Sequence, residues 1–209
     1  VPFKVNAQQV DIYSRESGTY LVLRNTATFP DIGSHWSKGD VESLAAKMIV
    51  TGRSEQAFVP DAPITRAEFA ALIVRALGLS AAAGPDSFED ISVYDWHAGS
   101  IRAAVEAGIV NGYSDGTFRP DRTITREEMA AMAHKALEYA GYEQGGDVPI
   151  RFADEAHIGA WAEEAVQVLG ELDILNGDNR QRFAPKSHAT RGESAAVLNR
   201  MLGKLTFAK

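Results

Sequence analysis

The chain has 209 residues, no cysteine and a formal net charge of −7. The lack of cysteine excludes disulfides, thiolate nucleophiles and cysteine-based zinc sites. The acidic balance argues against a nucleic-acid partner, which requires a basic face that displaces counterions from phosphates. No apolar run approaches the ~20 residues that a membrane-spanning helix needs, so we expect no membrane insertion.

The first segment, residues 1–28, stands outside the pattern that organises the rest of the chain. Within it, Thr19–Arg24 alternates in the manner of a β-strand. We therefore expect this short β-like extension to be a linker or the end of a preceding domain of the same polypeptide.

From residue 29 onward the sequence contains three copies of one pattern, which we assign to residues 29–84, 85–145 and 146–209. Each copy opens with a phenylalanine-x-aspartate signal and then carries a tryptophan, a glycine, a phenylalanine-x-proline and a Thr-Arg-x-Glu string at the same spacing. The equivalent residues are Trp36, Trp96 and Trp161; Gly52, Gly112 and Gly177; Phe58, Phe118 and Phe183; Arg66, Arg126 and Arg191; and Glu68, Glu128 and Glu193.

Each copy is predicted to form a helix, a loop and a second helix. In the first copy, Val41, Leu44, Ala45 and Met48 follow the spacing of one buried helical face, and Gly52 is expected to adopt the left-handed conformation of a helix cap.

The loop of the second copy shows the same organisation. Asp115-Gly116 predicts a turn and Phe118 an apolar anchor. The Thr-Arg-x-Glu string predicts a capping box at the start of each second helix. A single helix pair cannot bury its own apolar stripe, so we expect the second helices to share one core in an all-α, pseudo-threefold, three-lobed fold.

The arginines of this string are the main candidate ligand-binding residues. Arg66, Arg126 and Arg191 occupy the first helical position, where the helix dipole disfavours a cation and where we expect the side chain to be exposed. A guanidinium beside the free amides of a first helical turn makes a good carboxylate site. The alternative is that each arginine bridges to a glutamate or aspartate of a neighbouring repeat.

Other repeated residues leave two interpretations open. The tryptophans either stack on sugar rings or belong to the core. The glycines are expected to need a positive φ, although their bare backbone also admits a ligand closely.

The sequence predicts neither catalysis nor a cofactor. Glu68, Glu128 and Glu193 are best explained by helix capping, and no acid/base pair stands out. The five histidines lack metal spacing, and the loop at residues 115–121 lacks the alternating carboxylates of a calcium loop.

Taken together, Phe29-Pro-Asp, Trp36, Gly52, Phe58 and Ile64-Thr-Arg-Ala-Glu68 resemble the S-layer homology family, and the second copy, with Asn111-Gly-Tyr113, is closer still. The resemblance implies a module that anchors a secreted or S-layer protein of Gram-positive bacteria at the cell surface. The implied partner is a secondary cell-wall polysaccharide attached to peptidoglycan, with a pyruvate ketal on N-acetylmannosamine bound by the three arginines in grooves between lobes. Runner-up functions are a protein-interaction or lattice-forming module and a glycoside hydrolase fragment.

The copies also predict a ranking of sites. The second copy keeps Asn111–Tyr113, and we expect these residues and Arg126 to form the principal site. In the third copy Lys186 departs from the pattern, and Gly192 is expected to loosen the helix and blur the position of Arg191.

Overall fold

The computed structural model describes residues 3–6, 9–12, 18–19, 25–84, 88–142 and 151–205. It opens with an antiparallel hairpin of strands β1 (Phe3–Asn6) and β2 (Gln9–Ile12). The strand predicted at Thr19–Arg24 lies almost wholly outside the described residues. No helix in the described part is long and apolar enough to span a membrane.

Six α-helices lie in the described residues, two in each copy of the repeat, which confirms the all-α fold class. They are α1 (Lys38–Ala46) and α2 (Arg66–Ala76), α3 (Ala98–Glu106) and α4 (Arg126–Tyr139), and α5 (Glu163–Glu171) and α6 (Arg191–Lys204). Two short 3-10 helices, η1 (Pro30–Ile32) and η2 (Glu155–His157), precede α1 and α5.

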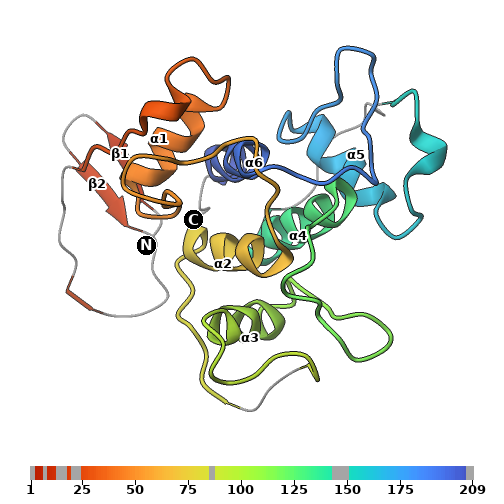
Figure 1. Ribbon diagram of the computed structural model, residues 1–209, viewed down its shortest axis with the longest axis horizontal. Helices are drawn as coiled ribbons and strands as arrows, with labels where there is room; N and C mark the ends of the chain where they lie inside the picture. The colour runs from red at the N-terminus through yellow and green to blue at the C-terminus, as the bar shows by residue number, and fades with distance from the viewer. Residues whose placement is uncertain are drawn as a thin grey trace.

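The second helices α2, α4 and α6 lie at the centre of the molecule and contact one another (Figure 1). The predicted shared core is therefore present. Each of these helices begins with the predicted capping box, in which the threonine hydroxyl accepts from the glutamate amide and the glutamate carboxylate accepts from the threonine amide. The threonines that cap these helices are Thr65, Thr125 and Thr190.

The first helix of each copy packs mainly against the second helix of the preceding copy. Helix α3 packs on α2, α5 packs on α4, and α1 packs on α6, so the order of the copies closes on itself (Figure 1). Each lobe therefore combines halves of two copies. One helix pair cannot bury its apolar area alone, and this packing between copies buries it.

The segments that precede the second helices also join the copies. Isolated β-bridges connect Thr65 with Thr123, Thr125 with His188, and Pro63 with Thr190. The first amides of each second helix then donate to carbonyls of the next copy, as in Arg66 N to Arg122 O at 2.9 Å. The prediction that these amides are free for a carboxylate is wrong, because neighbouring backbone satisfies them.

The end of the first helix also differs from the prediction. Helix α1 ends at Ala46, and Met48 has a φ of 58° and is 67% exposed, so Met48 is not on the buried face. Gly108 and Asp173 hold the same conformation at the equivalent positions, with φ of 68° and 57°. The left-handed residue thus lies four positions before the glycine that was expected to provide it.

Candidate functional site

In the part of the chain that the structure describes, three grooves lie between the lobes, and each is lined by all three copies. A groove takes its arginine from one copy, its loop and glutamate from the next, and its tryptophan from the remaining one. We name them by their arginines. The Arg66 groove includes Gly112, Tyr113, Glu128, Lys135 and Trp161; the Arg126 groove includes Gly177, Glu193, Arg200 and Trp36; the Arg191 groove includes Thr51, Glu68, Arg75 and Trp96.

The grooves differ in size. The Arg66 groove encloses about 590 Å³ and the Arg191 groove about 150 Å³. The Arg126 groove consists of two adjoining hollows of about 460 and 220 Å³, both lined by Arg126 and Trp36. Each has room for at least part of a sugar, and the Arg66 groove is the largest single hollow of the three.

An aspartate at the start of each copy shapes the loop of its groove. Both oxygens of Asp90 accept backbone amides, from Phe118 at 2.8 Å and Arg119 at 2.7 Å. Asp31 and Asp154 make the same pair of bonds in their own copies. The second residue of each pair has a positive φ, which is strained for a non-glycine residue and is the conformation that the carboxylate holds in place. The equivalent strained residues are Val59, Arg119 and Ala184.

Of the groove arginines, Arg66 is buried, and Arg126 and Arg191 are partly buried. Arg66 is 4% exposed, and the side chain of Arg126 is 12% exposed. Each Nε donates to the carbonyl of the buried phenylalanine in the next copy, at 2.9 Å for Arg66, 2.8 Å for Arg126 and 2.9 Å for Arg191. Burial lowers the pKa of Arg66 and Arg191. The expected exposure is wrong, because the neighbouring loop covers the first turn of the helix.

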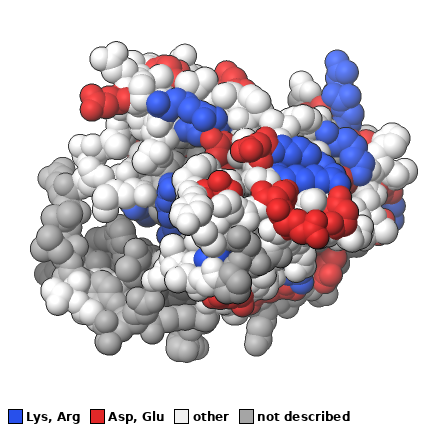
Figure 2. Space-filling view, turned by 60° about the horizontal axis from the view of Figure 1, so that its bottom comes forward, with Lys and Arg blue, Asp and Glu red and all other residues white. Residues whose placement is uncertain are grey.

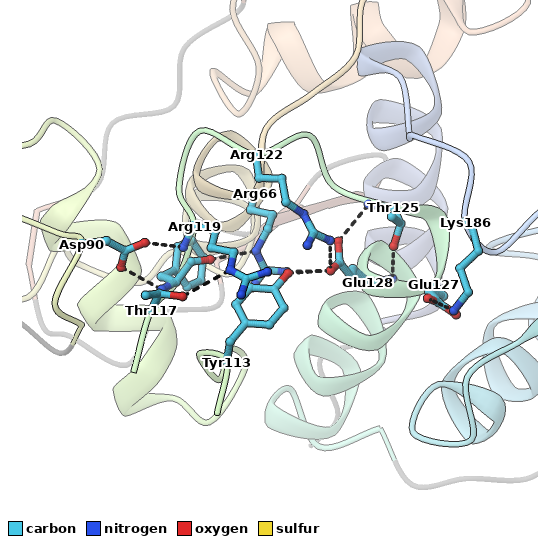
Figure 3. A network of polar contacts seen from close by, with 11 residues as sticks. Arg66, Asp90, Tyr113, Thr117, Arg119, Arg122, Thr125, Glu127, Glu128 and Lys186 are labelled. Carbon is cyan, nitrogen blue, oxygen red and sulfur yellow. Dashed lines mark hydrogen bonds and ion pairs between the residues drawn. The ribbon is translucent and has the colours of Figure 1, made fainter. Parts of the chain in front are cut away.

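In the Arg66 groove the polar groups form one network (Figure 3). The Tyr113 hydroxyl donates to Glu128 at 2.6 Å, Arg122 pairs with the same carboxylate, and Arg66 Nη1 lies 3.6 Å from it. Burial alone would raise the pKa of Glu128, but the Thr125 amide, Tyr113 and the two arginines lower it overall. The structural alternative, in which each arginine bridges to a carboxylate of a neighbouring repeat, therefore holds loosely for Arg66, at 3.6 Å from Glu128, and closely for Arg126, which pairs with Glu193 at 2.5 Å.

The tryptophans lie at the groove edges and are not core residues. Trp36, Trp96 and Trp161 are 60%, 64% and 60% exposed. Single exposed apolar side chains are common on protein surfaces, so exposure by itself does not identify a ligand contact. Stacking on a sugar ring stays a prediction for these three residues.

The repeated glycines are crowded, but none has a positive φ. A Cβ on Gly112 would lie 2.2 Å from the Phe88 ring, and a Cβ on Gly52 would lie 2.3 Å from Ser54 O. A Cβ on Gly177 would lie 3.0 Å from Arg182 O. The predicted positive φ is wrong; glycine is required because the copy's own loop and phenylalanine approach its backbone closely.

Charges of both signs meet on the surface. Figure 2 shows groups of Lys and Arg side chains directly beside groups of Asp and Glu on one face. An anionic partner would therefore meet local basic positions rather than a uniformly attractive surface, since screening in salt limits charge effects to about 10 Å.

Known proteins share this pattern. The sequence profile of the S-layer homology domain matches residues 28–70, 87–130 and 151–195, one match in each copy. The chain belongs to the S-layer homology family. Membership places it in a family of bacterial cell-surface proteins, while the limits of the three S-layer homology repeats at residues 29–84, 85–145 and 146–209 stay predictions.

Individual relatives carry the S-layer homology repeats within longer polypeptides. Exoglucanase XynX of Acetivibrio thermocellus is 39% identical over 88% of this chain and 17% of its own length. The cellulosome-anchoring protein of the same species is 38% identical over 69% and 33%. The surface-layer 125 kDa protein of Lysinibacillus sphaericus is 30% identical over 81% and 14%. The chain thus spans about a sixth of the exoglucanase, and the similarity covers only a small part of that enzyme.

The structure corrects how the S-layer homology repeats combine into sites. Asn111–Tyr113 lie in the groove of Arg66, whereas Arg126 lies in the groove of Asn176 and Gly177. The expected pairing of Arg126 with the loop of its own repeat is wrong. The cause is that the first helix of each repeat packs on the second helix of the preceding repeat. This packing places each arginine beside the loop of the next repeat.

Gly192 also has a different role from the one predicted. Its amide donates to Pro60 O at 2.8 Å, and a Cβ at this position would lie 2.9 Å from Ser37 Oγ. Arg191 beside it is held by Phe58 O at 2.9 Å and by Thr51 O at 2.8 Å. Gly192 therefore permits close contact between the third and first repeats and does not blur the position of Arg191.

Sequence reasoning missed one basic residue in each groove. Arg75, Lys135 and Arg200 lie on the second helices and line the Arg191, Arg66 and Arg126 grooves. Each follows the arginine of its own repeat at the same spacing, so a comparison of the three copies for charge would have found them. They add a second cation to every groove.

Proposed function

We propose that this chain anchors the polypeptide that carries it to the bacterial cell wall, by binding an anionic secondary cell-wall polysaccharide in its grooves. The observation that carries the proposal is the combination, repeated in all three grooves, of a buried or partly buried guanidinium, a second cation and a mostly exposed tryptophan. A cation recognises an acidic substituent, and an exposed aromatic ring covers the apolar face of a sugar.

The acidic substituent that fits best is a carboxylate such as a pyruvate ketal on N-acetylmannosamine. A carboxylate has two oxygens, and a guanidinium held by its Nε still presents nitrogen donors at its other end. Lys135, which pairs with Glu138 at 2.6 Å, supplies a second cation on the opposite helix of the Arg66 groove. The names of relatives agree with anchoring: one is a cellulosome-anchoring protein and another a surface-layer protein.

Binding to purified cell walls tests the anchoring role. The chain should sediment with walls that have been treated with protease, and it should stay in solution once acid extraction has removed their polysaccharide. Loss of binding after protease alone would instead indicate a protein-interaction module. Release of sugar from the walls over time would indicate a glycoside hydrolase and contradict the proposal.

Competition with a synthetic sugar tests the chemical class. The methyl glycoside of pyruvylated N-acetylmannosamine should displace the chain from walls, and the same glycoside without pyruvate serves as the matched control. Equal displacement by the two sugars would show that the acidic group is not recognised.

A further inference from the structure

The three groove glutamates share one bond and differ in another. In Glu68, Glu128 and Glu193, Oε2 accepts from the amide of the capping threonine, at 3.1, 3.0 and 2.8 Å. The helix cap therefore fixes one oxygen of each carboxylate. The partner of the other oxygen, Oε1, is set by the surroundings of each groove.

In the Arg126 groove this oxygen binds the groove arginine itself. Glu193 Oε1 accepts from Arg126 Nη1 at 2.5 Å. The other two nitrogens of the guanidinium donate to Phe183 O at 2.8 Å and Asn176 O at 3.0 Å. Every nitrogen of Arg126 thus has a partner within the protein.

In the Arg191 groove, Oε1 of the glutamate binds a residue other than the groove arginine. Glu68 Oε1 pairs with Arg53 Nη1 at 3.0 Å. Arg191 donates from Nε to Phe58 O and from Nη2 to Thr51 O. Its Nη1 has no hydrogen-bond partner among the residues that the structure describes, and it belongs to a side chain that lines the groove.

In the Arg66 groove, too, the guanidinium keeps nitrogens without a hydrogen bond to any described residue, but different residues hold the glutamate (Figure 3). Glu128 Oε1 accepts from the Tyr113 hydroxyl at 2.6 Å and pairs with Arg122, which leaves it 3.6 Å from Arg66 Nη1, beyond hydrogen-bond distance. Within the described part of the chain, only Nε of Arg66 makes a hydrogen bond. The two Nη atoms of this buried guanidinium make no hydrogen bond with residues that the structure describes, and Arg66 lines the largest single hollow of the grooves, where its Nη1 forms only a long ion pair with Glu128.

The position directly after the groove glycine accounts for the difference. It holds Arg53, Tyr113 and Asp178 in the three repeats. Arg53 and Tyr113 engage the groove glutamate. Asp178 instead pairs with Arg182 of its own loop at 2.7 Å, and a carboxylate cannot attract Glu193.

We propose that this position sets which grooves accept an anionic group: Arg53 and Tyr113 hold the glutamate away from the groove arginine, whereas Asp178 leaves Glu193 to close the Arg126 groove from within. The inference rests on the proposed function and specifies which of its grooves bind. A ligand carboxylate in the Arg126 groove must displace Glu193, while the other two grooves offer a guanidinium nitrogen at once.

The charges of the groove linings separate the Arg191 groove from the other two. The Arg126 groove balances three basic side chains, Arg126, Arg182 and Arg200, against three acidic ones, Asp61, Asp178 and Glu193. In the Arg191 groove, Arg75 and Arg191 face a single carboxylate, Glu68, which Arg53 already neutralises. The Arg66 groove also balances two basic side chains, Arg66 and Lys135, against two acidic ones, Glu128 and Glu164. Net charge therefore favours the Arg191 groove alone, and the division between the other two grooves rests on where the glutamate is held.

Titration calorimetry with the methyl glycoside of pyruvylated N-acetylmannosamine tests the proposal on the full chain. The parent should bind at two sites. Glu193→Gln should add a third, because the single oxygen of the glutamine stays on the Thr190 amide and its NH₂ group cannot accept from Arg126. The opened groove should bind about tenfold more tightly than the closed groove of the parent, whose binding is too weak to count as a site, because the charged pair no longer competes.

Two further variants should remove a site. Arg53→Gln frees Glu68 to close the Arg191 groove, and Tyr113→Phe combined with Arg122→Ala frees Glu128 to close the Arg66 groove. Glu163→Gln, the same change at an exposed residue outside the grooves, should leave two sites. The thermal unfolding midpoint of each variant, compared with that of the parent, shows whether the variant is still folded when a site is lost.

The outcomes separate the two proposals. Three sites in the parent, or two in both the parent and Glu193→Gln, would overturn the inference while wall anchoring stands. No binding of the sugar by the parent or by any variant would overturn both the inference and the recognition of pyruvate. A count of two that becomes three in Glu193→Gln supports both.

Discussion

Arg191, the first residue of the last helix, donates from Nε to the carbonyl oxygen of Phe58 at 2.9 Å, across 133 positions of the chain. The bond joins the third repeat to the first, and equivalent bonds from Arg66 and Arg126 join the other pairs. The groove arginines therefore hold the repeats together as well as lining the grooves.

Arg126→Ala should weaken folding, whereas wall binding through the Arg66 and Arg191 grooves should remain. The substitution removes bonds to Phe183 O, Asn176 O and Glu193, and losing charge-assisted bonds from a side chain that is 12% exposed should cost about 1.5–3 kcal/mol of unfolding free energy. Urea unfolding measures this loss. A variant with the parent's midpoint would show that the arginine does not connect the repeats.

Trp161→Ala should reduce wall binding several-fold without changing stability. The ring is 60% exposed, so its removal should change the unfolding free energy by no more than about 0.5 kcal/mol. Tyr94→Ala removes a ring that is 94% exposed and lines none of the three grooves, and it serves as the control. Sedimentation with walls compares the two, and equal binding by both variants would remove the tryptophan from the site.

Gly192→Ala should destabilise the protein, whereas Gly203→Ala should not. A Cβ on Gly192 would lie 2.9 Å from Ser37 Oγ and 3.2 Å from Pro60 O, so the contact between the third and first repeats must open, at a cost of about 1–3 kcal/mol. Gly203 lies in the same helix with nothing within 4 Å, and alanine there should gain about 0.5–1 kcal/mol. Chemical denaturation of both variants measures the difference, and a stabilised Gly192→Ala would contradict the close contact.

Asp31→Asn should cost stability at neutral pH and cost less in acid. Although desolvation acts to raise it, the amides of Phe58 and Val59 lower the pKa of Asp31 below its ordinary value of 3.8. A carboxylate with a lowered folded pKa stabilises the fold fully above that ordinary value and loses its contribution as the pH falls through the folded pKa. Denaturation midpoints from about pH 6 to about pH 2 should converge for the parent and the variant. A constant gap across this range would mean that the charge of Asp31 does not stabilise the loop.

Truncation before the third repeat, from about Gly145 onward, should destabilise what remains. The deletion removes α6, against which α1 packs, and it removes Arg191 from the loop at Phe58. Thermal unfolding should show a lower and broader transition than in the full chain. A truncated protein that melts as high and as sharply would mean that the repeats fold independently.

Much of this architecture is predictable from local pattern. The capping boxes at Thr65, Thr125 and Thr190 and the buried Phe118 follow from short-range rules, because a cap and an apolar anchor depend on neighbours in the sequence. The central packing of the second helices follows from the need to bury their apolar faces.

The pairing of repeats is not predictable in the same way. Three copies with one pattern have three equivalent loops. The sequence around Arg126 does not determine that this residue contacts Asn176 and not Asn111. That choice is made by packing of helices from different copies. The burial of Arg66 was missed for the same reason, since the first position of a helix is exposed only when no neighbouring loop covers it.

The packing of α1 on α6 also fixes how many repeats one module holds. In an open solenoid a further repeat would extend the stack, since each unit touches only its neighbours. Here the position beside α6 is already filled by α1, and α2, α4 and α6 meet one another around the centre (Figure 1). A fourth copy would have to displace α1 or remain outside, so further repeats would have to form a separate closed set instead of extending this one.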